Sequence, residues 1–261
     1  MLIQNRYDGF FGELYAIRDN KPKETEITWL VRKAEEEGSS VCELACGAGR
    51  LTIPLAERGF EVVGMDLSET LIDIANHRLK SLPAEVAQRA RFVQGDLRQF
   101  DLGQRFPFIF IFFGGFEHLT EPTEHRSSLR CIRKHLEPDG LLEIEFMTPS
   151  GPKEYFEKPR IVDKKRGRIE SLDIDYTERT TLWWLDAKRY CWKTRIWVRH
   201  DDGREEYHEC QSVNWAFTLE EIPDLMSECG FKVEQILGAH EYPLRPPSSE
   251  NSSWIVDARP A

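Results

Sequence analysis

Short apolar runs alternate with amphipathic segments over the first part of the chain, up to residue 147. Apolar residues at helical spacing predict helices near 27–34, 50–58, 68–79 and 122–136. The apolar runs between them predict strands at 41–46, 60–65, 91–94, 108–113 and 141–147. The run at 108–113 does not alternate, which is typical of a strand covered on both faces. This order predicts an α/β fold with right-handed crossovers and a mostly parallel sheet that has helices on both faces.

The pattern changes after Thr148. From about Gly167 to Phe217 apolar and polar residues alternate as they do in β-hairpins. Asp201-Asp202-Gly203 is a strong hairpin turn signal within this stretch. The sequence therefore predicts an inserted antiparallel sheet at 149–217.

The segments around this insertion are expected to complete the main domain. Pro138-Asp139-Gly140 predicts a turn before the fifth strand. Thr218 is expected to cap a helix at 219–229, and the strands predicted at 231–237 and 253–258 should pair as a hairpin at one sheet edge. The chain thus divides into parts at 1–148, 149–217 and 218–261.

Charge and cysteine content argue against several classes of protein. The formal net charge of −10 disfavours a nucleic-acid binder, and the basic run at 164–168 is interpreted as a solvated turn. The six cysteines contain no CxxC pair, which argues against a zinc or disulfide framework and favours a reducing compartment. No signal pattern and no long apolar run is present, so we expect a cytoplasmic protein without a membrane partner or a metal.

The most informative segment is ELACGAGR at 43–50, between the first strand and the next helix. Its glycines, Gly47 and Gly49, let the backbone approach a ligand closely because no Cβ stands in the way. The helix that follows directs its free N–H groups at that ligand. Since ligands bind at the carboxyl ends of parallel strands, this segment predicts a nucleotide-type cofactor site.

Acidic residues follow the next two strands at the same expected edge. Asp66 lies 17 residues after Gly49, a spacing that suits a carboxylate accepting both hydroxyls of a ribose. Asp96 could accept the exocyclic amino group of an adenine. Each aspartate also has a structural interpretation, since Asp66 could begin a helix and Asp96 could form a turn. Their convergence on one edge with the glycine turn favours the cofactor site.

A dinucleotide site fits this segment less well. The GxGxxG fingerprint requires a third glycine, and Thr52 stands at that position. Glu43 would repel a pyrophosphate but would favour a cationic ligand, such as an amino group beside a sulfonium.

On these residues the chain resembles the class I S-adenosylmethionine-dependent methyltransferases, in their small-molecule branch. ELACGAGR matches the first motif of that family, VVGMDLS the second and FVQGDLRQF the third, while FIFIFFGGFEHL resembles its fourth strand and following loop. The resemblance implies a Rossmann-like, seven-stranded sheet with a final antiparallel hairpin. It also implies S-adenosylmethionine as the cofactor and S-adenosylhomocysteine as the product. The usual glycine of the first motif is alanine at position 45.

The motif positions imply which residues hold each part of the cofactor. The methionine part would be lined by Glu43, Ala45 and Gly47. The ribose and adenine would be lined by Met65, Asp66, Asp96 and Leu97. The residues expected beside the cofactor are Phe112 and Phe113, and the set is completed by Gly49 and Leu67.

Methyl transfer requires little from side chains beyond positioning, unless the acceptor is a hydroxyl that needs a base. His118 lies in the loop where such a base would lie, with Glu117 beside it, although a histidine there could also pack locally. Tyr15 belongs to an aromatic N-terminal segment that could form a lid over the cofactor, and Arg18 could pair with the methionine carboxylate. The same segment could be an ordinary amphipathic helix packed on the domain.

The inserted sheet carries much of the tryptophan of the chain, which suggests a cover over the substrate, a homodimer interface, or both. The leading interpretation is methyl transfer to a nitrogen or oxygen of a small-molecule acceptor, without a nucleic-acid partner. An RNA or protein methyltransferase is the alternative enzyme, and a basic face would favour it. A non-catalytic protein that binds the same cofactor is the alternative of a different class.

Overall fold

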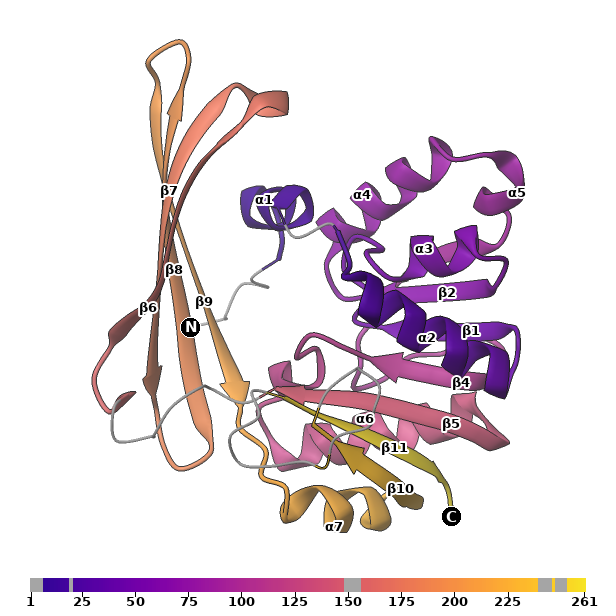
Figure 1. The fold of residues 1–261 in the computed structure, drawn as a ribbon. Coiled ribbons are helices and arrows are strands. Elements are labelled where there is room, and N and C mark those ends of the chain that lie inside the picture. The colour runs from indigo at the N-terminus through magenta and orange to yellow at the C-terminus, as the bar shows by residue number, and fades with distance from the viewer. Residues whose placement is uncertain (1–6, 19–20, 148–155, 239–245, 247–252) are drawn as a thin grey trace. The chain divides into compact units, whose positions relative to one another are not determined.

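The computed structural model describes residues 7–18, 21–147, 156–238, 246 and 253–261. These residues form two compact units (Figure 1), a main unit within 7–147 and 217–261 and an inserted unit at 156–216. The first six residues of the predicted lid segment and residues 148–155, at the start of the predicted insertion, lie outside the described residues.

The sheet of the main unit has seven strands in the order β10-β11-β5-β4-β1-β2-β3. The strands are β1 (Ser40–Leu44), β2 (Glu61–Asp66), β3 (Ala90–Gln94), β4 (Phe106–Ile111), β5 (Leu136–Met147), β10 (Phe231–Leu237) and β11 (Ser253–Pro260). The first five are parallel, and β10 and β11 form the antiparallel hairpin predicted at one edge. The strand order reverses between β1 and β4, which opens a crevice at their carboxyl ends. The predicted Rossmann-like fold is confirmed.

Helices cover both faces of this sheet (Figure 1). One face carries α2 (Glu24–Glu37), α3 (Thr52–Glu57), α4 (Glu69–Lys80) and α5 (Ala84–Ala87). Their apolar side chains share one buried core with Phe110 and Leu141 of the strands. The other face carries α6 (Pro122–His135) and α7 (Glu221–Glu228). There Phe146 packs against Phe217, which also contacts His125 of α6. Residues 141 and 146 point to opposite faces because side chains alternate along a strand.

Two local predictions in the main unit are wrong. Residues 138–140 do not form a turn but lie inside β5, where the pairing with β4 shifts register between Phe106 and Phe108. This irregularity absorbs the extra residues without ending the strand. Thr218 does not cap α7, because the helix begins at Glu221, whose carboxylate accepts the Thr218 N–H at 3.1 Å.

The inserted unit is a four-stranded antiparallel sheet in the order β6-β7-β8-β9. Its strands are β6 (Arg160–Ile169), β7 (Ile174–Trp184), β8 (Arg189–His200) and β9 (Glu205–Trp215). The turn at 201–203 joins β8 to β9, which confirms the predicted hairpin. The basic run at 164–168 is not a turn but part of the edge strand β6. Exposed Lys and Arg side chains on an edge strand hinder pairing with other strands.

Candidate active site

The glycine turn leaves the carboxyl end of β1 in a left-handed conformation. Ala45, Gly47 and Gly49 have φ angles of 58°, 55° and 78°. A left-handed backbone costs a residue with a Cβ roughly 1 kcal/mol more than glycine, so Ala45 carries local strain that the family's usual glycine would not. The Gly47 N–H donates to Asp66 Oδ2 at 2.8 Å, which ties the turn to the end of β2.

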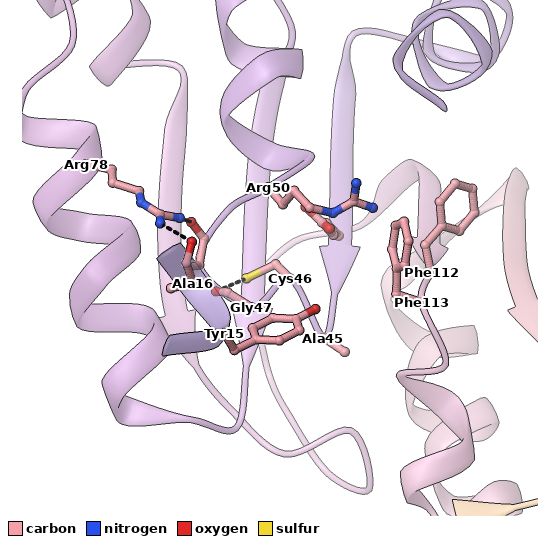
Figure 2. Close-up of a pocket in the computed structure, with 11 residues that line it drawn as sticks. Tyr15, Ala16, Ala45, Cys46, Gly47, Arg50, Arg78, Phe112 and Phe113 are labelled. Carbon is pink, nitrogen blue, oxygen red and sulfur yellow. Dashed lines mark hydrogen bonds between the residues drawn. The ribbon is translucent and has the colours of Figure 1, made fainter. Parts of the chain in front are cut away.

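A pocket lies against this turn (Figure 2) and encloses about 390 Å³ together with its open mouth. The walls come from helix α1 (Phe10–Arg18), the glycine turn, α4 and the end of β4. The sequence-predicted residues that line the pocket are Tyr15, Glu43, Ala45, Gly47, Phe112 and Phe113. Segments far apart in the chain therefore converge on one cavity.

Glu43 is buried at the floor of this pocket. The Thr52 hydroxyl, from the first residue of α3, donates to its carboxylate. Burial raises the pKa of Glu43 to about 7, against the opposing effects of the Thr52 hydrogen bond and the Arg50 charge. A carboxyl in this state can ionise when a cation binds beside it, which fits the positively charged groups of S-adenosylmethionine.

Asp66 stands behind the turn rather than in the pocket lining. Its two carboxylate oxygens accept the Gly47 and Ser68 N–H groups, each at 2.8 Å. Burial raises the pKa of Asp66, and these two hydrogen bonds oppose the rise. Asp66 therefore fixes the turn against β2, and its predicted contact with a ribose stays a prediction.

The remaining predicted cofactor residues also lie outside this lining, and they are Arg18, Gly49, Met65, Leu67, Asp96 and Leu97. The Asp96 carboxylate is engaged by Arg98, whose Nε donates to both oxygens at 2.9 and 3.0 Å. Burial raises the pKa of Asp96, but the hydrogen bonds and charge of Arg98 lower it overall. Arg98 also pairs with Glu124 at 3.0 Å. The predicted adenine contact of Asp96 stays a prediction.

Two pocket cations were not among the predicted site residues. Arg78 donates from its two terminal nitrogens to Ala48 O at 2.8 Å and to Ala16 O at 2.7 Å (Figure 2), so it joins α1 to the glycine turn. Arg50 lies over the Phe113 ring, with 3.5 Å from the guanidinium carbon to the ring centroid. Arg50 follows Gly49 directly, so its place beside the glycine turn could have been predicted from the sequence. Nothing in the sequence places Arg78 beside the turn.

Glu117 lies in the short 3₁₀ helix η1 (Phe116–His118), which follows β4. It is buried, and one oxygen accepts the Met147 N–H. The other oxygen, Oε2, has no hydrogen-bond partner in the part of the chain that the structure describes. Burial raises the pKa of Glu117 to about 8, and the nearby Glu145 carboxylate adds to the rise. Glu145 is itself held by the Phe113 N–H at 2.9 Å.

His118 differs from its neighbour in being exposed. Its ring meets the ring of Tyr7 edge-on at 5.7 Å, and Tyr7 meets Tyr15 at 4.9 Å. Tyr15 belongs to α1 and lines the pocket. A row of aromatic rings therefore links the loop after β4 to the N-terminal helix, and the predicted lid stays a prediction.

Known proteins resemble this chain in both sequence and fold. Residues 41–140, from β1 into β5, match a family model described as a methyltransferase domain. These residues are therefore a methyltransferase domain, and the chain has the fold of S-adenosylmethionine-dependent methyltransferases. The match covers the glycine turn, Asp66, Asp96 and Glu117, so these residues lie in the methyltransferase domain itself.

Two relatives and one solved structure show the range of proteins that this methyltransferase resembles. It is 25% identical over 234 residues to the putative methyltransferase YqeM of Bacillus subtilis, with 88% of each chain covered. It is 31% identical to a dTDP-3-amino-3,4,6-trideoxy-alpha-D-glucopyranose N,N-dimethyltransferase of Streptomyces venezuelae, over 53% of this chain and 54% of that one. The fold matches that of CalS10, an amino pentose methyltransferase of Micromonospora echinaspora solved with S-adenosylmethionine bound, with a TM-score of 0.68, 20% identity and 95% and 96% coverage.

Proposed function

We propose that this methyltransferase transfers the methyl group of S-adenosylmethionine to an amino nitrogen of a small-molecule acceptor. The observation that carries the proposal is the buried carboxyl of Glu117, in the segment that follows the pocket residue Phe113. One of its oxygens has no partner among the described residues. The cofactor supplies a methyl group activated by its positively charged sulfur, and an acceptor nitrogen that takes this group must release a proton. Glu117 is our candidate to receive that proton.

The chemistry of Glu117 favours an amine over a hydroxyl acceptor. A pKa of about 8 lies near that of an alkylammonium, which loses its proton at about 10. A sugar hydroxyl is a far weaker acid and would call for a stronger base. The adjacent Glu145 carboxylate adds a second negative charge to the local field, which attracts a cationic acceptor.

The relatives support the same acceptor class. The Streptomyces venezuelae relative is named for N,N-dimethylation of a nucleotide-linked amino sugar. CalS10 is described as an amino pentose methyltransferase. An amino sugar joined to a nucleotide is therefore the acceptor class to test first. The net charge of −10 agrees with a small acceptor rather than RNA.

The experiment compares two acceptors that differ at one atom. Formation of S-adenosylhomocysteine is measured with a nucleotide-linked amino sugar and with the corresponding sugar that bears a hydroxyl in place of the amine. We expect turnover with the amine and none with the hydroxyl. In the wild type, kcat should rise with pH through about 8, because the base must be ionised to accept a proton.

Glu117→Gln should lower kcat by roughly 100-fold and remove this rise, with the affinity for S-adenosylhomocysteine unchanged. The exposed neighbour provides the matched variant, His118→Asn, which should retain the pH profile. Turnover of the hydroxyl acceptor alone would contradict the proposal. Binding of S-adenosylhomocysteine without turnover across amines, hydroxyls and RNA would favour a non-catalytic protein instead.

The other predicted partners stay predictions. The inserted sheet is predicted to cover the substrate or to form a homodimer interface. The lack of a nucleic-acid partner and the cytoplasmic location are predictions as well. The rings of Trp197 and Tyr207 in the inserted unit lie with their centroids 5.5 Å apart and their planes tilted by 51°, and both side chains are exposed. In the described part of the chain, no helix has the length and apolar character needed to cross a membrane.

A further inference from the structure

Arg50 has a hydrogen-bonding capacity that its protein contacts do not use. One terminal nitrogen donates to Glu26 Oε2 at 2.9 Å, and the guanidinium lies on the face of Phe113. The second terminal nitrogen, NH2, is buried and has no partner among the described residues. A buried donor left unpaired costs about 1–3 kcal/mol, so such an atom points to a ligand that completes it.

The pocket offers no equivalent donor on its other arginine. Both terminal nitrogens of Arg78 are committed to the backbone carbonyls of Ala16 and Ala48. Arg18 is absent from the residues that line the pocket. Arg50 therefore combines a place in the lining with an unpaired terminal nitrogen (Figure 2).

We propose that Arg50, and not Arg18, binds the carboxylate of the amino-acid part of S-adenosylmethionine. A guanidinium presents several N–H donors in one plane and forms charge-assisted hydrogen bonds to carboxylates. Glu43 lines the same pocket and carries the opposite charge when ionised, so it suits the ammonium group of the same amino acid. The two residues flank the glycine turn and together match a zwitterion. The inference rests on the cofactor of the proposed function and is independent of the methyl acceptor.

The Phe113 ring makes this geometry specific to arginine. The backbone of Phe113 has a left-handed conformation with φ of 59°, and the Phe113 N–H donates to Glu145 Oε2 at 2.9 Å. The planar guanidinium of Arg50 lies on the ring of this residue, 3.5 Å from its centroid. A lysine would keep the charge of Arg50 but lose both the stacking and the fork of donors.

The test measures affinity by titration calorimetry with two ligands that differ only in the carboxylate, S-adenosylhomocysteine and its decarboxylated form. Arg50→Met should lower the affinity for S-adenosylhomocysteine by roughly 10- to 100-fold. It should lower the affinity for the decarboxylated ligand by less than about twofold. Arg50→Lys should give an intermediate loss on S-adenosylhomocysteine. Arg18→Met is the matched variant and should weaken neither ligand selectively.

Equal weakening of both ligands by Arg50→Met would overturn the proposal and make Arg50 a structural residue. If Arg18→Met instead lowers only the affinity for S-adenosylhomocysteine, Arg18 is the residue that binds the carboxylate. Thermal unfolding of each variant checks the fold, and Arg50→Lys keeps the test decisive if Arg50→Met unfolds. Wild-type protein that binds neither ligand would refute the cofactor itself, whereas a wild type that binds both equally would refute only the role of Arg50.

Discussion

Glu43 and Glu117 are both acidic residues whose burial raises their pKa, to about 7 and about 8. They differ in their partners, because Glu43 accepts a hydrogen bond from Thr52 while one oxygen of Glu117 has no partner in the described chain. Their raised pKa values mean that each neutral carboxyl stabilises the folded protein fully below the unfolded pKa of about 4.5. That stabilisation is lost as the pH rises through the folded pKa of each group.

The affinity of this methyltransferase for S-adenosylhomocysteine should rise roughly tenfold between pH 6 and pH 8. The reason is that Glu43 loses its proton across this range and its charge then attracts the ammonium group of the ligand. Titration calorimetry in buffers with different ionisation heats should also detect the released proton. Glu43→Gln should bind more weakly, with an affinity that no longer depends on pH. An equal rise in both proteins would assign the effect to another group.

At the scale of the element, a side chain from a third element joins helix α1 to the glycine turn. Arg78 of α4 bridges Ala16 O and Ala48 O, and Ala16 and Tyr15 of α1 form part of the pocket wall. Burial lowers the pKa of Arg78, which nevertheless stays charged at neutral pH. The position of α1 therefore depends on α4 as well as on its own sequence.

Arg78→Met should release α1 from the turn, because the methionine has no donor for either carbonyl. Hydrogen exchange of the amides in α1 should become faster, while exchange in the strands stays the same. The affinity for S-adenosylhomocysteine should fall by roughly tenfold, since a charged hydrogen bond contributes about 1.5–3 kcal/mol. The control is Lys80→Met, an exposed residue of the same helix, which should change neither quantity. Unchanged exchange in α1 would contradict the bridging role.

The same scale shows which elements the sequence predicts well. The strands from β1 to β4 and the hairpin of β10 and β11 match the apolar runs, because a buried strand needs apolar residues locally. The sequence also predicts the N-terminal cap of α4, where the Ser68 hydroxyl accepts the Leu71 N–H at 3.1 Å. The turn at 138–140 and the cap at Thr218 failed, since the pairing of β5 with β4 and the carboxylate of Glu221 override these local signals.

At the scale of the whole main unit, a buried polar network joins segments from both ends of the chain. Lys33 of α2 contacts Asp257 of β11 at 2.5 Å and Glu143 of β5 at 3.7 Å. Glu143 also accepts the Trp29 indole N–H at 2.8 Å. Burial and the adjacent Asp257 raise the pKa of Glu143. The Lys33 ammonium therefore faces two carboxyl groups inside the fold.

Lys33→Met should lower the free energy of unfolding by about 3 kcal/mol or more, because it leaves a buried carboxylate without its cation. The double variant Lys33→Met with Asp257→Asn should recover much of this loss by removing the unpaired charge. Lys232→Met changes an exposed lysine of β10 and should alter the stability by less than about 0.5 kcal/mol. Urea unfolding measures all three. A double variant no more stable than Lys33→Met would show that packing, not charge balance, sets the loss.

The sequence by itself determined the order of strands and helices, the glycine turn at their switch point and the kind of cofactor. These features are local, because the period of apolar residues and the spacing from Gly49 to Asp66 are fixed along the chain. They led to the fold and to the family before any contact was known.

Only the tertiary structure decided what the charged side chains do. Arg78 bridges to Ala16 and Lys33 pairs with Asp257, and each contact joins distant parts of the chain. The burial of Glu117 likewise results from the folded chain as a whole. Burial and the choice of partner set the pKa of a carboxyl and the free donors of a guanidinium, and neither can be read from neighbours in sequence. For this reason the sequence proposed Arg18 for the carboxylate, while the unpaired nitrogen of Arg50 became visible only in the folded pocket.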